Sequence, residues 1–225
     1  TLYDPVGGLA DARAGRVRFV GDARMRIAED VLRLLRYFRF YAHYGRSGPD
    51  DEALAACREM APRLSTLAAE RVWSELRRLL MAPDPAATLD LMAQAGVLPH
   101  VLPEATSRRR LGALTRLEAR LDIRPDAIRR LAAALEVDEA GAKSLAIRMR
   151  MATAEARRLT SLAAPVLRPD LRAGDAANRV VLYRLGEDAF RDLALIGAAG
   201  DSDPEGRGWD PVLTLPARAP VPIFP

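Results

Sequence analysis

The stretch "RIAEDVLRLLRYFRF", Arg26 to Phe40, places two adjacent acids and four arginines in a window of helix length. With about 100° of rotation per residue, its apolar side chains fall within an arc of roughly 80° and form a stripe that a core can bury. These apolar residues are Ile27, Val31, Leu34, Leu35 and Phe38. We therefore predict one helix over residues 24–44.

The charged residues of this helix gather on the opposite side, within about 120°. They are Arg26, Glu29, Asp30, Arg33 and Arg36. One interpretation is a solvated face, held by ion pairs between residues three and four apart that contribute about 0.3–0.5 kcal/mol each. The other is a recognition site, because an ionised Asp30 only accepts hydrogen bonds and Arg33 only donates them.

An acceptor beside a donor matches the Watson–Crick edges of cytosine and adenine, which both carry an exocyclic amine next to an unprotonated ring nitrogen. Guanine and uracil present a carbonyl next to an N–H, so both protein groups would stay unpaired, at about 1–3 kcal/mol for each buried group. Under this second interpretation, Asp30 and Arg33 select C and A against G and U.

The composition favours helices in the rest of the chain. Of the 225 residues, 49% are hydrophobic but only 5% are aromatic, which is typical of helical proteins. No run approaches about 18 uninterrupted apolar residues, so we predict no membrane-spanning helix. The single cysteine, Cys57, excludes an internal disulfide; we expect it to be a small buried side chain in a protein of the reducing cytoplasm. The net charge of +4 is compatible with a polyanionic partner.

We predict a mainly all-α fold, with one short β-strand over Val17–Val20 and an extended C-terminal arm after Gly200. The arm is predicted because residues 201–225 are rich in Gly and Pro. Helices are predicted at residues 24–44, 50–61, 67–82, 84–96, 107–121, 125–135, 138–150, 153–164, 175–185 and 187–199.

Two segments resemble a known family. The stretch "YDPVGGLADARAGRVRFVGDARMRIAEDVLRLLRYFRF" looks like the junction of the bacterial class II tRNA nucleotidyltransferases, the CCA-adding enzymes, and of the related poly(A) polymerases. The stretch "LSTLAAERVWSELRRLLMAPDPAATLDLMAQAGVLPHVLPE" is similar to the helical RNA-binding region that follows in that family. The matching junction positions are Asp4-Pro5, Gly7-Gly8, Asp11, Arg18 to Asp22, and Glu29-Asp30 through Arg39-Phe40.

The resemblance implies roles for matched residues. Asp30 and Arg33 would select the nucleotide, with Glu29 beside them and Arg36 supporting the pocket. The Gly7-Gly8 and Asp11 segment would be a mobile element that reshapes the pocket between C and A addition. Glu70, Arg71 and Glu75 would buttress the pocket from the next helical region. Two departures from the family are Ala68, in place of a serine that caps this helix, and Tyr37, in place of a smaller residue. We expect Ser65 or Thr66 to supply the cap.

The resemblance also implies a domain order. Residues 1–21 would be the end of a nucleotidyltransferase head, 22–62 a neck with the nucleotide-selecting helix, 63–135 an RNA-binding body, 136–200 a helical tail and 201–225 the arm. The family's two Mg²⁺ ions bind an Asp-x-Asp strand in the head, and ATP and CTP are the substrates. The only Asp-x-Asp here is Asp201-Ser202-Asp203, in a Gly/Pro-rich loop, so we predict no metal site and no catalysis by this chain alone.

Other basic and aromatic residues have two interpretations each. Arg108, Arg109 and Arg110 form a row that either neutralises tRNA phosphates or is a solvated helix start. Positive charge is slightly unfavourable at a helix start, which favours RNA binding. The pairs Arg77-Arg78, Arg129-Arg130 and Arg157-Arg158 are more typical of a solvated surface. Trp73 is expected in the core, whereas Trp209 is either a docking anchor or part of a linker.

The expected function is therefore nucleotide selection and tRNA binding within an enzyme that adds CCA to tRNA 3′ ends. Poly(A) addition stays open, because the pairing of Asp30 and Arg33 accepts A as well as C. A helical RNA-binding module without catalysis is the third alternative.

Overall fold

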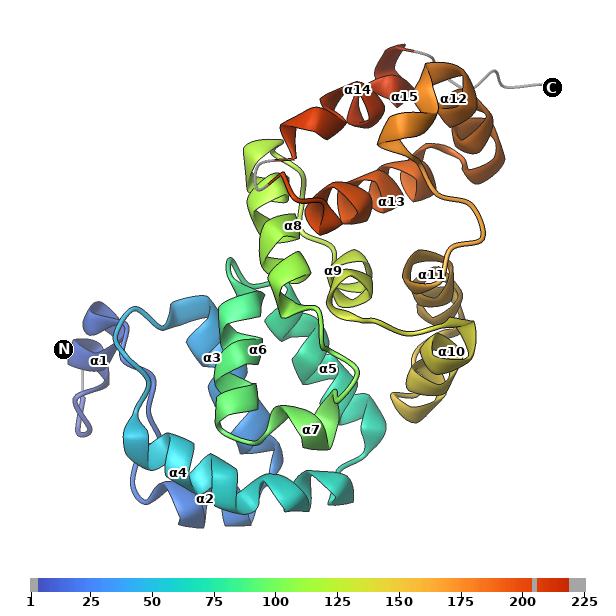
Figure 1. Cartoon of the computed structure of the whole chain (residues 1–225). Coiled ribbons are helices and arrows are strands. Elements are labelled where there is room, and N and C mark those ends of the chain that lie inside the picture. Colours follow the sequence, from blue (N-terminus) through green and yellow to red (C-terminus); the bar gives the residue numbers. More distant parts are fainter. Residues whose placement is uncertain (1–3, 204–205, 219–225) are drawn as a thin grey trace. The chain divides into compact units, whose positions relative to one another are not determined.

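The structure is a computed structural model that describes residues 4–203 and 206–218. These residues form helices joined by short connections (Figure 1), which confirms the prediction of a mainly all-α fold. The elements are α1 (Gly8–Ala14), α2 (Ala23–Glu29), α3 (Leu32–Tyr44), α4 (Asp51–Met60), η1 (Ala61–Thr66), α5 (Ala69–Leu80), α6 (Pro85–Gln94), α7 (Leu98–Val101), α8 (Arg108–Arg120), α9 (Ala127–Ala134), α10 (Glu139–Arg148), α11 (Thr153–Ala163), η2 (Leu171–Ala173), α12 (Gly174–Leu185), α13 (Glu187–Gly200), η3 (Arg207–Trp209), α14 (Asp210–Leu213) and α15 (Leu215–Arg218).

The chain forms two compact units. Unit 1 comprises Thr1–Pro103 with Arg148–Arg150, and unit 2 comprises Glu104–Ile147 with Met151–Pro225. The boundary after Pro103 lies inside the stretch 63–135 that the sequence predicts as one body. The predicted functional division into neck, body and tail stays a prediction.

Unit 1 is built around α3, which packs against α5 and α6, while α2 packs against α4. The predicted apolar stripe is buried: Ile27, Leu34 and Phe38 are each 0% exposed. Trp73 on α5 also lies in this core, as predicted. Cys57 on α4 is the expected small buried side chain, and burial raises the pKa of its thiol to about 12.

The helix predicted over residues 24–44 is wrong at one point, because it consists of two helices. α2 ends at Glu29, and α3 begins at Leu32. Between them, Asp30 has an extended backbone with φ −151° and ψ 105°. Its carboxylate accepts a hydrogen bond from Leu32 N at 3.1 Å, and its carbonyl accepts one from Arg33 N at 3.0 Å. Aspartate competes in this way for backbone N–H groups, which ends one helix and begins the next.

Aspartates also begin several of the later helices, close to the predicted positions. The carboxylates of Asp50, Asp84 and Asp126 accept hydrogen bonds from the N–H groups three residues on, at 2.8, 3.1 and 2.8 Å. Asp138 does the same for Gly141 N at 2.8 Å. Each of these bonds satisfies an N–H that has no partner within its helix, and such caps contribute about 1 kcal/mol.

The predicted strand over Val17–Val20 is wrong, since no strand occurs in residues 4–203 and 206–218. A strand needs a hydrogen-bonded partner strand, and local alternation of residue types does not supply one. Instead, the ring of Phe19 stacks on Tyr37 of α3, with 5.5 Å between ring centroids. Before this segment, the Gly7-Gly8 turn opens the short helix α1, where Gly7 adopts the left-handed φ of 73°.

The prediction of an unpacked arm is also wrong for residues 206–218. This segment forms η3, α14 and α15, and Trp209, Val212 and Leu215 belong to the core of unit 2. Trp209 is 7% exposed, so it is a core residue rather than part of an unpacked linker. Apolar residues at positions 209, 212 and 215 recur at helical spacing, a signal that the Gly and Pro content obscures. Residues 219–225 of the predicted arm lie outside the described residues.

Gly197 is required for the packing of Trp209. A Cβ added to Gly197 would lie 2.7 Å from Cη2 of Trp209, closer than carbon atoms approach, whereas a Cβ on Gly200 of the same helix would have its nearest neighbour at 3.6 Å. We expect Gly197→Ala to lower the free energy of unfolding by about 1–3 kcal/mol and Gly200→Ala to leave it nearly unchanged. Urea denaturation followed by circular dichroism measures both, and equal effects would contradict this packing.

None of the described helices combines the length and apolar character needed to cross a membrane.

Candidate functional site

The break between α2 and α3 holds the carboxylate of Asp30 in a defined position. Its Oδ1 atom accepts the Leu32 N–H at 3.1 Å, and its Oδ2 atom lies 3.3 Å from Nη2 of Arg71 on α5. The Asp30 side chain is 31% exposed, so a ligand can still reach it. Arg71, which lies 41 positions from Asp30 in the sequence, thus helps to fix the Asp30 carboxylate as a hydrogen-bond acceptor at the start of α3.

Arg33 lies on the first turn of α3 and pairs with Glu29 at the end of α2. Its Nη1 atom also donates a hydrogen bond to the carbonyl of Arg26 at 3.0 Å, and the Arg26 side chain pairs with Glu29 at 2.7 Å. The hydrogen bond from Arg33, together with the charge of Arg26, holds the pKa of Glu29 below its ordinary value. The ion-pair interpretation of Arg26, Glu29 and Arg33 is therefore confirmed. Arg33 remains 30% exposed and can exchange these partners for a ligand.

A cavity of about 250 Å³ adjoins Arg33 and Arg36. Tyr37 and Phe40 of α3 also line it, as does the segment 17–19, while Asp30 is not one of its lining residues. Tyr37, the larger residue at a position where the family has a small one, is only 3% exposed, and its hydroxyl accepts a hydrogen bond from Asp50 N at 3.3 Å. Three arginines, Arg18, Arg33 and Arg36, thus line the cavity beside aromatic rings, a combination suited to a nucleotide.

The predicted mobile element adjoins this cavity through Arg18. The carboxylate of Asp11 lies 2.6 Å from Nε of Arg18, and Arg18 also donates to the carbonyl of Val6 at 3.1 Å. The Asp4 carboxylate accepts the N–H of Gly8 at 2.7 Å, which anchors the start of α1. These contacts are exposed and few, which is typical of a segment that can rearrange; its mobility stays a prediction.

The predicted support helix reaches the site through two of its three residues. Arg71 pairs with Asp30, and the buried carboxylate of Glu75 lies 3.2 Å from Nε of Arg39 on α3. Glu70 instead pairs with Arg150, at 2.9 Å. Through Arg71 and Glu75, α5 therefore fixes both the start and the middle of α3.

The cap predicted for α5 is wrong. Ser65 Oγ and Thr66 Oγ1 donate hydrogen bonds to the carbonyls of Pro62 and Arg63, which lie in η1 and not in α5. The N-cap residue is Ala68, which makes no side-chain cap bond. The Glu70 carboxylate accepts its own backbone N–H, which, with the hydrogen bond from Arg150, lowers the pKa of Glu70. An acid in the first turn thus takes over part of the role of the missing serine.

The row Arg108–Arg110 divides into different roles in unit 2. Arg110 donates from Nε to the carbonyl of Ala133 at 2.6 Å and from Nη2 to that of Leu135, so it caps the end of α9. Arg108 donates to the carbonyl of Ala105 at 2.9 Å. Arg109 is exposed and lies seven residues before the exposed Arg116, on the same face of α8. RNA binding by this row stays a prediction, and Arg109 is its most accessible member.

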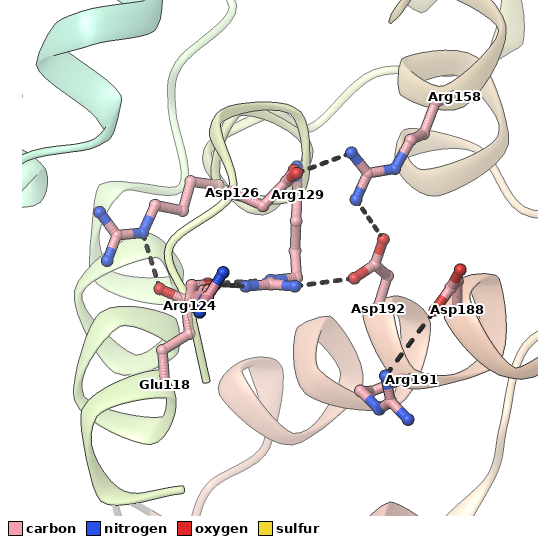
Figure 2. A network of polar contacts seen from close by, with 9 residues as sticks. Glu118, Arg124, Asp126, Arg129, Arg158, Asp188, Arg191 and Asp192 are labelled. Carbon is pink, nitrogen blue, oxygen red and sulfur yellow. Dashed lines mark hydrogen bonds and ion pairs between the residues drawn. The ribbon is translucent and has the colours of Figure 1, made fainter. Parts of the chain in front are cut away.

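A buried ionic network in unit 2 was not predicted from the sequence. Arg129 and Arg130, predicted as a surface pair, are 5% and 3% exposed. Arg129 donates to Glu118 Oε1 at 2.8 Å and to Asp192 Oδ1 at 2.9 Å, and Arg130 donates to Glu118 Oε2 at 2.7 Å. Figure 2 shows how Arg129 points between the carboxylates of α8 and α13. Helical periodicity cannot reveal such a network, because the partners lie 11 and 63 residues away in sequence.

Arg158 closes the network on its exposed side by bridging Asp126 at 2.8 Å and Asp192 at 2.6 Å (Figure 2). Four helices of unit 2, α8, α9, α11 and α13, are therefore joined through side-chain charges. In the sequence, Arg158 stands beside Arg157, and such a pair of arginines is typical of a solvated surface rather than of a network. Its carboxylate partners lie 32 and 34 residues away.

The network predicts a specific loss of stability in acid. Burial alone would raise the pKa of Asp126, but the hydrogen bonds from Arg158 and from the Arg129 N–H outweigh burial and hold this pKa below its ordinary value. The stability that Asp126 contributes is therefore present above about pH 4 and is lost as the pH falls through the lowered pKa. In Arg158→Met the pKa of Asp126 moves back toward its unfolded value, so we expect lower stability at neutral pH and a smaller further loss in acid. Urea midpoints measured between pH 7 and pH 2.5 test this, and identical pH profiles would contradict it.

The residues of Asp201-Ser202-Asp203 do not fit a pair of Mg²⁺ ions. Asp201 accepts hydrogen bonds from Trp209 Nε1 at 3.0 Å and from Ser202 N at 2.6 Å, and these bonds lower its pKa. Asp203 accepts the Gly208 N–H at 3.1 Å. Both carboxylates thus accept hydrogen bonds from residues of η3. Across the described part of the chain, no three His, Cys, Asp or Glu side chains cluster as metal ligands would.

Comparison with known proteins shows what this chain is similar to. Residues 49–108 match the family model described as the probable RNA and SrmB-binding site of polymerase A. The chain is 45% identical over 105 residues to a CCA-adding enzyme of Bordetella pertussis, which covers 46% of this chain and 28% of that protein. It is 44% identical over 103 residues to the mitochondrial CCA tRNA nucleotidyltransferase 1 of Mus musculus, covering 45% of this chain and 24% of that protein.

Two further matches extend beyond unit 1. A multifunctional CCA protein of Burkholderia pseudomallei is 34% identical over 153 residues, which is 67% of this chain and 35% of that protein. The crystal structure of the Bacillus stearothermophilus CCA-adding enzyme in complex with CTP has the same fold over 97% of this chain and 54% of that one, with a TM-score of 0.73 and 23% identity. The sequence matches span about a quarter to a third of the length of each curated relative. Over the matched stretches the chain is similar to the CCA-adding enzymes.

Proposed function

We propose that this chain selects the incoming nucleotide and binds tRNA within an enzyme that adds CCA to tRNA 3′ ends without a template. The observation that carries the proposal is the position of Asp30, whose carboxylate is fixed by Leu32 N and Arg71 at a break between two helices. Arg33 follows one turn later with an accessible guanidinium group. The names of the matched relatives support the same activity.

In this proposal Asp30 accepts a hydrogen bond from the exocyclic amine of C or A, while Arg33 donates to the adjacent ring nitrogen. Arg33 must leave its present partner Glu29, whereas Asp30 can keep Arg71, because a carboxylate has acceptor sites for a further hydrogen bond. The Arg33 and Glu29 side chains are 30% and 49% exposed, so breaking their pair costs at most about 1 kcal/mol. A complementary base edge repays this cost, whereas G and U leave both groups unpaired.

Catalysis in this proposal depends on residues outside this chain. ATP and CTP are the expected substrates, and Mg²⁺ supplies charge stabilisation for nucleotidyl transfer when it is bound. Because Asp201 and Asp203 are engaged in loop hydrogen bonds, we assign the metal to a nucleotidyltransferase head and expect this chain alone to be inactive. A cytoplasmic location stays a prediction.

Binding of a tRNA that lacks its 3′ end by the 225-residue chain tests the RNA-binding part of the proposal. Removing one arginine that binds a phosphate should reduce the salt dependence of the association constant by about one unit of slope. We expect Arg109→Ala to show this reduction in fluorescence anisotropy. The control is Lys143→Ala, since Lys143 already pairs with Glu139 at 2.5 Å. Tight tRNA binding with no change in slope would remove Arg109 from the interface, and no tRNA binding would contradict the RNA-binding role.

Poly(A) addition is the second candidate, and the family model for residues 49–108 supports it, since its description names polymerase A. Both activities use A, so Asp30 and Arg33 serve either one. Only C addition separates them, and an assay with CTP alone therefore decides between the two.

Arg71 is a positioning residue in this proposal, because it acts on the base through Asp30. Removing its exposed ion pair should change the free energy of unfolding by less than about 1 kcal/mol. We expect Arg71→Ala, in the enzyme with its catalytic head, to lower the preference for CTP over UTP about 5- to 10-fold. Arg71→Lys should restore part of that preference, and Arg78→Ala, an exposed residue of the same helix, should leave it unchanged. Unaltered selectivity in Arg71→Ala would remove this role.

A further inference from the structure

Unit 2 contains a second cavity, of about 520 Å³, far along the sequence from Asp30. The end of α11, the segment 165–172 and the helix α13 line it, and Trp209 forms part of its wall. Its volume lies within the range of small-molecule sites, about 300–1,000 Å³. The contacts of Asp30, Arg33 and the α3 cavity involve none of these residues.

One side of this cavity is apolar and rigid. Leu162, Leu171 and Ile196 line it together with the indole of Trp209. The Trp209 ring is held by the hydrogen bond from its Nε1 to Asp201 Oδ2 at 3.0 Å, and by its close approach to Gly197. An indole fixed in this way loses little conformational entropy when a planar ring packs against it.

The rim of the cavity is positively charged. Arg110, Arg168 and Arg172 line it, with Asp170 and Asp201 as the acids. Both acids are engaged: Asp170 accepts the Arg172 N–H at 2.8 Å, and Asp201 accepts Trp209 Nε1 and Ser202 N.

The two exposed guanidinium groups of this rim, Arg168 and Arg172, form no ion pair with a carboxylate among the described residues. Arg110 donates to main-chain carbonyls, which carry no formal charge. The rim therefore attracts an anionic group.

We propose that this cavity binds a nucleoside monophosphate unit, with the base against Trp209 and the apolar wall and the phosphate on Arg168 and Arg172. Guanidinium groups match the geometry of phosphate through paired N–H donors, and a base stacked on an aromatic ring explains the apolar wall. A free nucleotide and an unstacked nucleotide of an RNA present the same chemistry. The RNA source rests on the proposed function, whereas the free nucleotide does not.

The fluorescence of Trp209 reports directly on this site. The sequence has two tryptophans, so Trp73→Phe leaves Trp209 as the single emitter. In this background the chain is titrated with AMP, with ribose 5-phosphate, which lacks the base, and with a tRNA. Each titration is repeated in the double variant Arg168→Ala/Arg172→Ala. The control variant is Arg179→Ala/Arg184→Ala, which removes the same charge from exposed positions of α12.

We expect a saturable change in Trp209 emission that weakens at least 10-fold in the double variant and persists in the control. If AMP produces it, the site accepts a free nucleotide; if only the tRNA produces it, the site takes a nucleotide of RNA. Ribose 5-phosphate binding as tightly as AMP would overturn the placement of the base. No change dependent on Arg168 and Arg172 with either AMP or tRNA would overturn the proposal, while tRNA binding measured by anisotropy would still support the proposed function.

Discussion

Replacing Arg129 by methionine is expected to lower the free energy of unfolding by about 3–5 kcal/mol, the largest effect on stability that the structure predicts. Arg129 is 5% exposed, and its partners Glu118 and Asp192 are 1% and 5% exposed. Without the guanidinium group, Asp192 keeps Arg158 and Glu118 keeps Arg130, but one acceptor oxygen of each carboxylate stays buried without its donor. Methionine fills a volume similar to that of arginine, so the loss of stability measures the missing charge rather than a cavity in the core.

Urea denaturation followed by circular dichroism measures this effect. The control is Arg191→Met on α13, because Arg191 is 43% exposed and lies 3.7 Å from a fully exposed Asp188. That exposed pair should contribute less than about 1 kcal/mol. Equal losses in the two variants would mean that the network of Figure 2 does not hold unit 2 together.

The second large effect concerns selectivity. In the enzyme with its catalytic head, Asp30→Ala is expected to reduce the preference for C and A over U and G about 10- to 100-fold, because the amine of the correct base loses its acceptor. Binding of tRNA should change little, since Asp30 contributes no positive charge to phosphate contacts. Single-nucleotide addition rates with CTP and with UTP measure the preference.

Asp30→Asn separates base selection from helix capping. An asparagine keeps an oxygen that can accept the Leu32 N–H, so the start of α3 is preserved. It loses the charge that pairs with Arg71 and adds an N–H₂ donor, which suits the carbonyl of U or G. Selectivity should therefore fall in Asp30→Asn while the free energy of unfolding stays within about 1 kcal/mol of the original protein. Unchanged selectivity in both variants would contradict base reading by Asp30.

Most of the fold follows from local sequence signals. The apolar stripe of α3 is a local feature, and α4, α6 and α9 lie where the sequence predicts helices. The errors occur where the outcome depends on distant partners. The segment 17–20 alternates like a strand but has no partner strand among the described residues. The segment 206–218 is rich in Gly and Pro, yet the core of unit 2 provides a surface on which its apolar residues pack.

The candidate site was predicted less completely than the fold. The sequence alone predicts an acceptor at Asp30 and a donor at Arg33, because donor and acceptor chemistry belongs to the residue types. The sequence does not predict the helix break at Asp30, since the apolar stripe continues through it and favours one unbroken helix. The contact from Arg71 and the burial of Arg129 depend on tertiary packing, which periodicity does not encode.

The central claim is tested most directly by nucleotide addition. A protein that joins this chain to a nucleotidyltransferase head of the family is given a tRNA lacking its 3′ end, with Mg²⁺ and CTP, ATP, both, or UTP and GTP. Product lengths are then read on a sequencing gel. We predict two additions of C from CTP alone, a single A after them when ATP is also present, then a stop, and no use of UTP or GTP. Long A tails without any C would contradict CCA addition and assign the chain to a poly(A) polymerase.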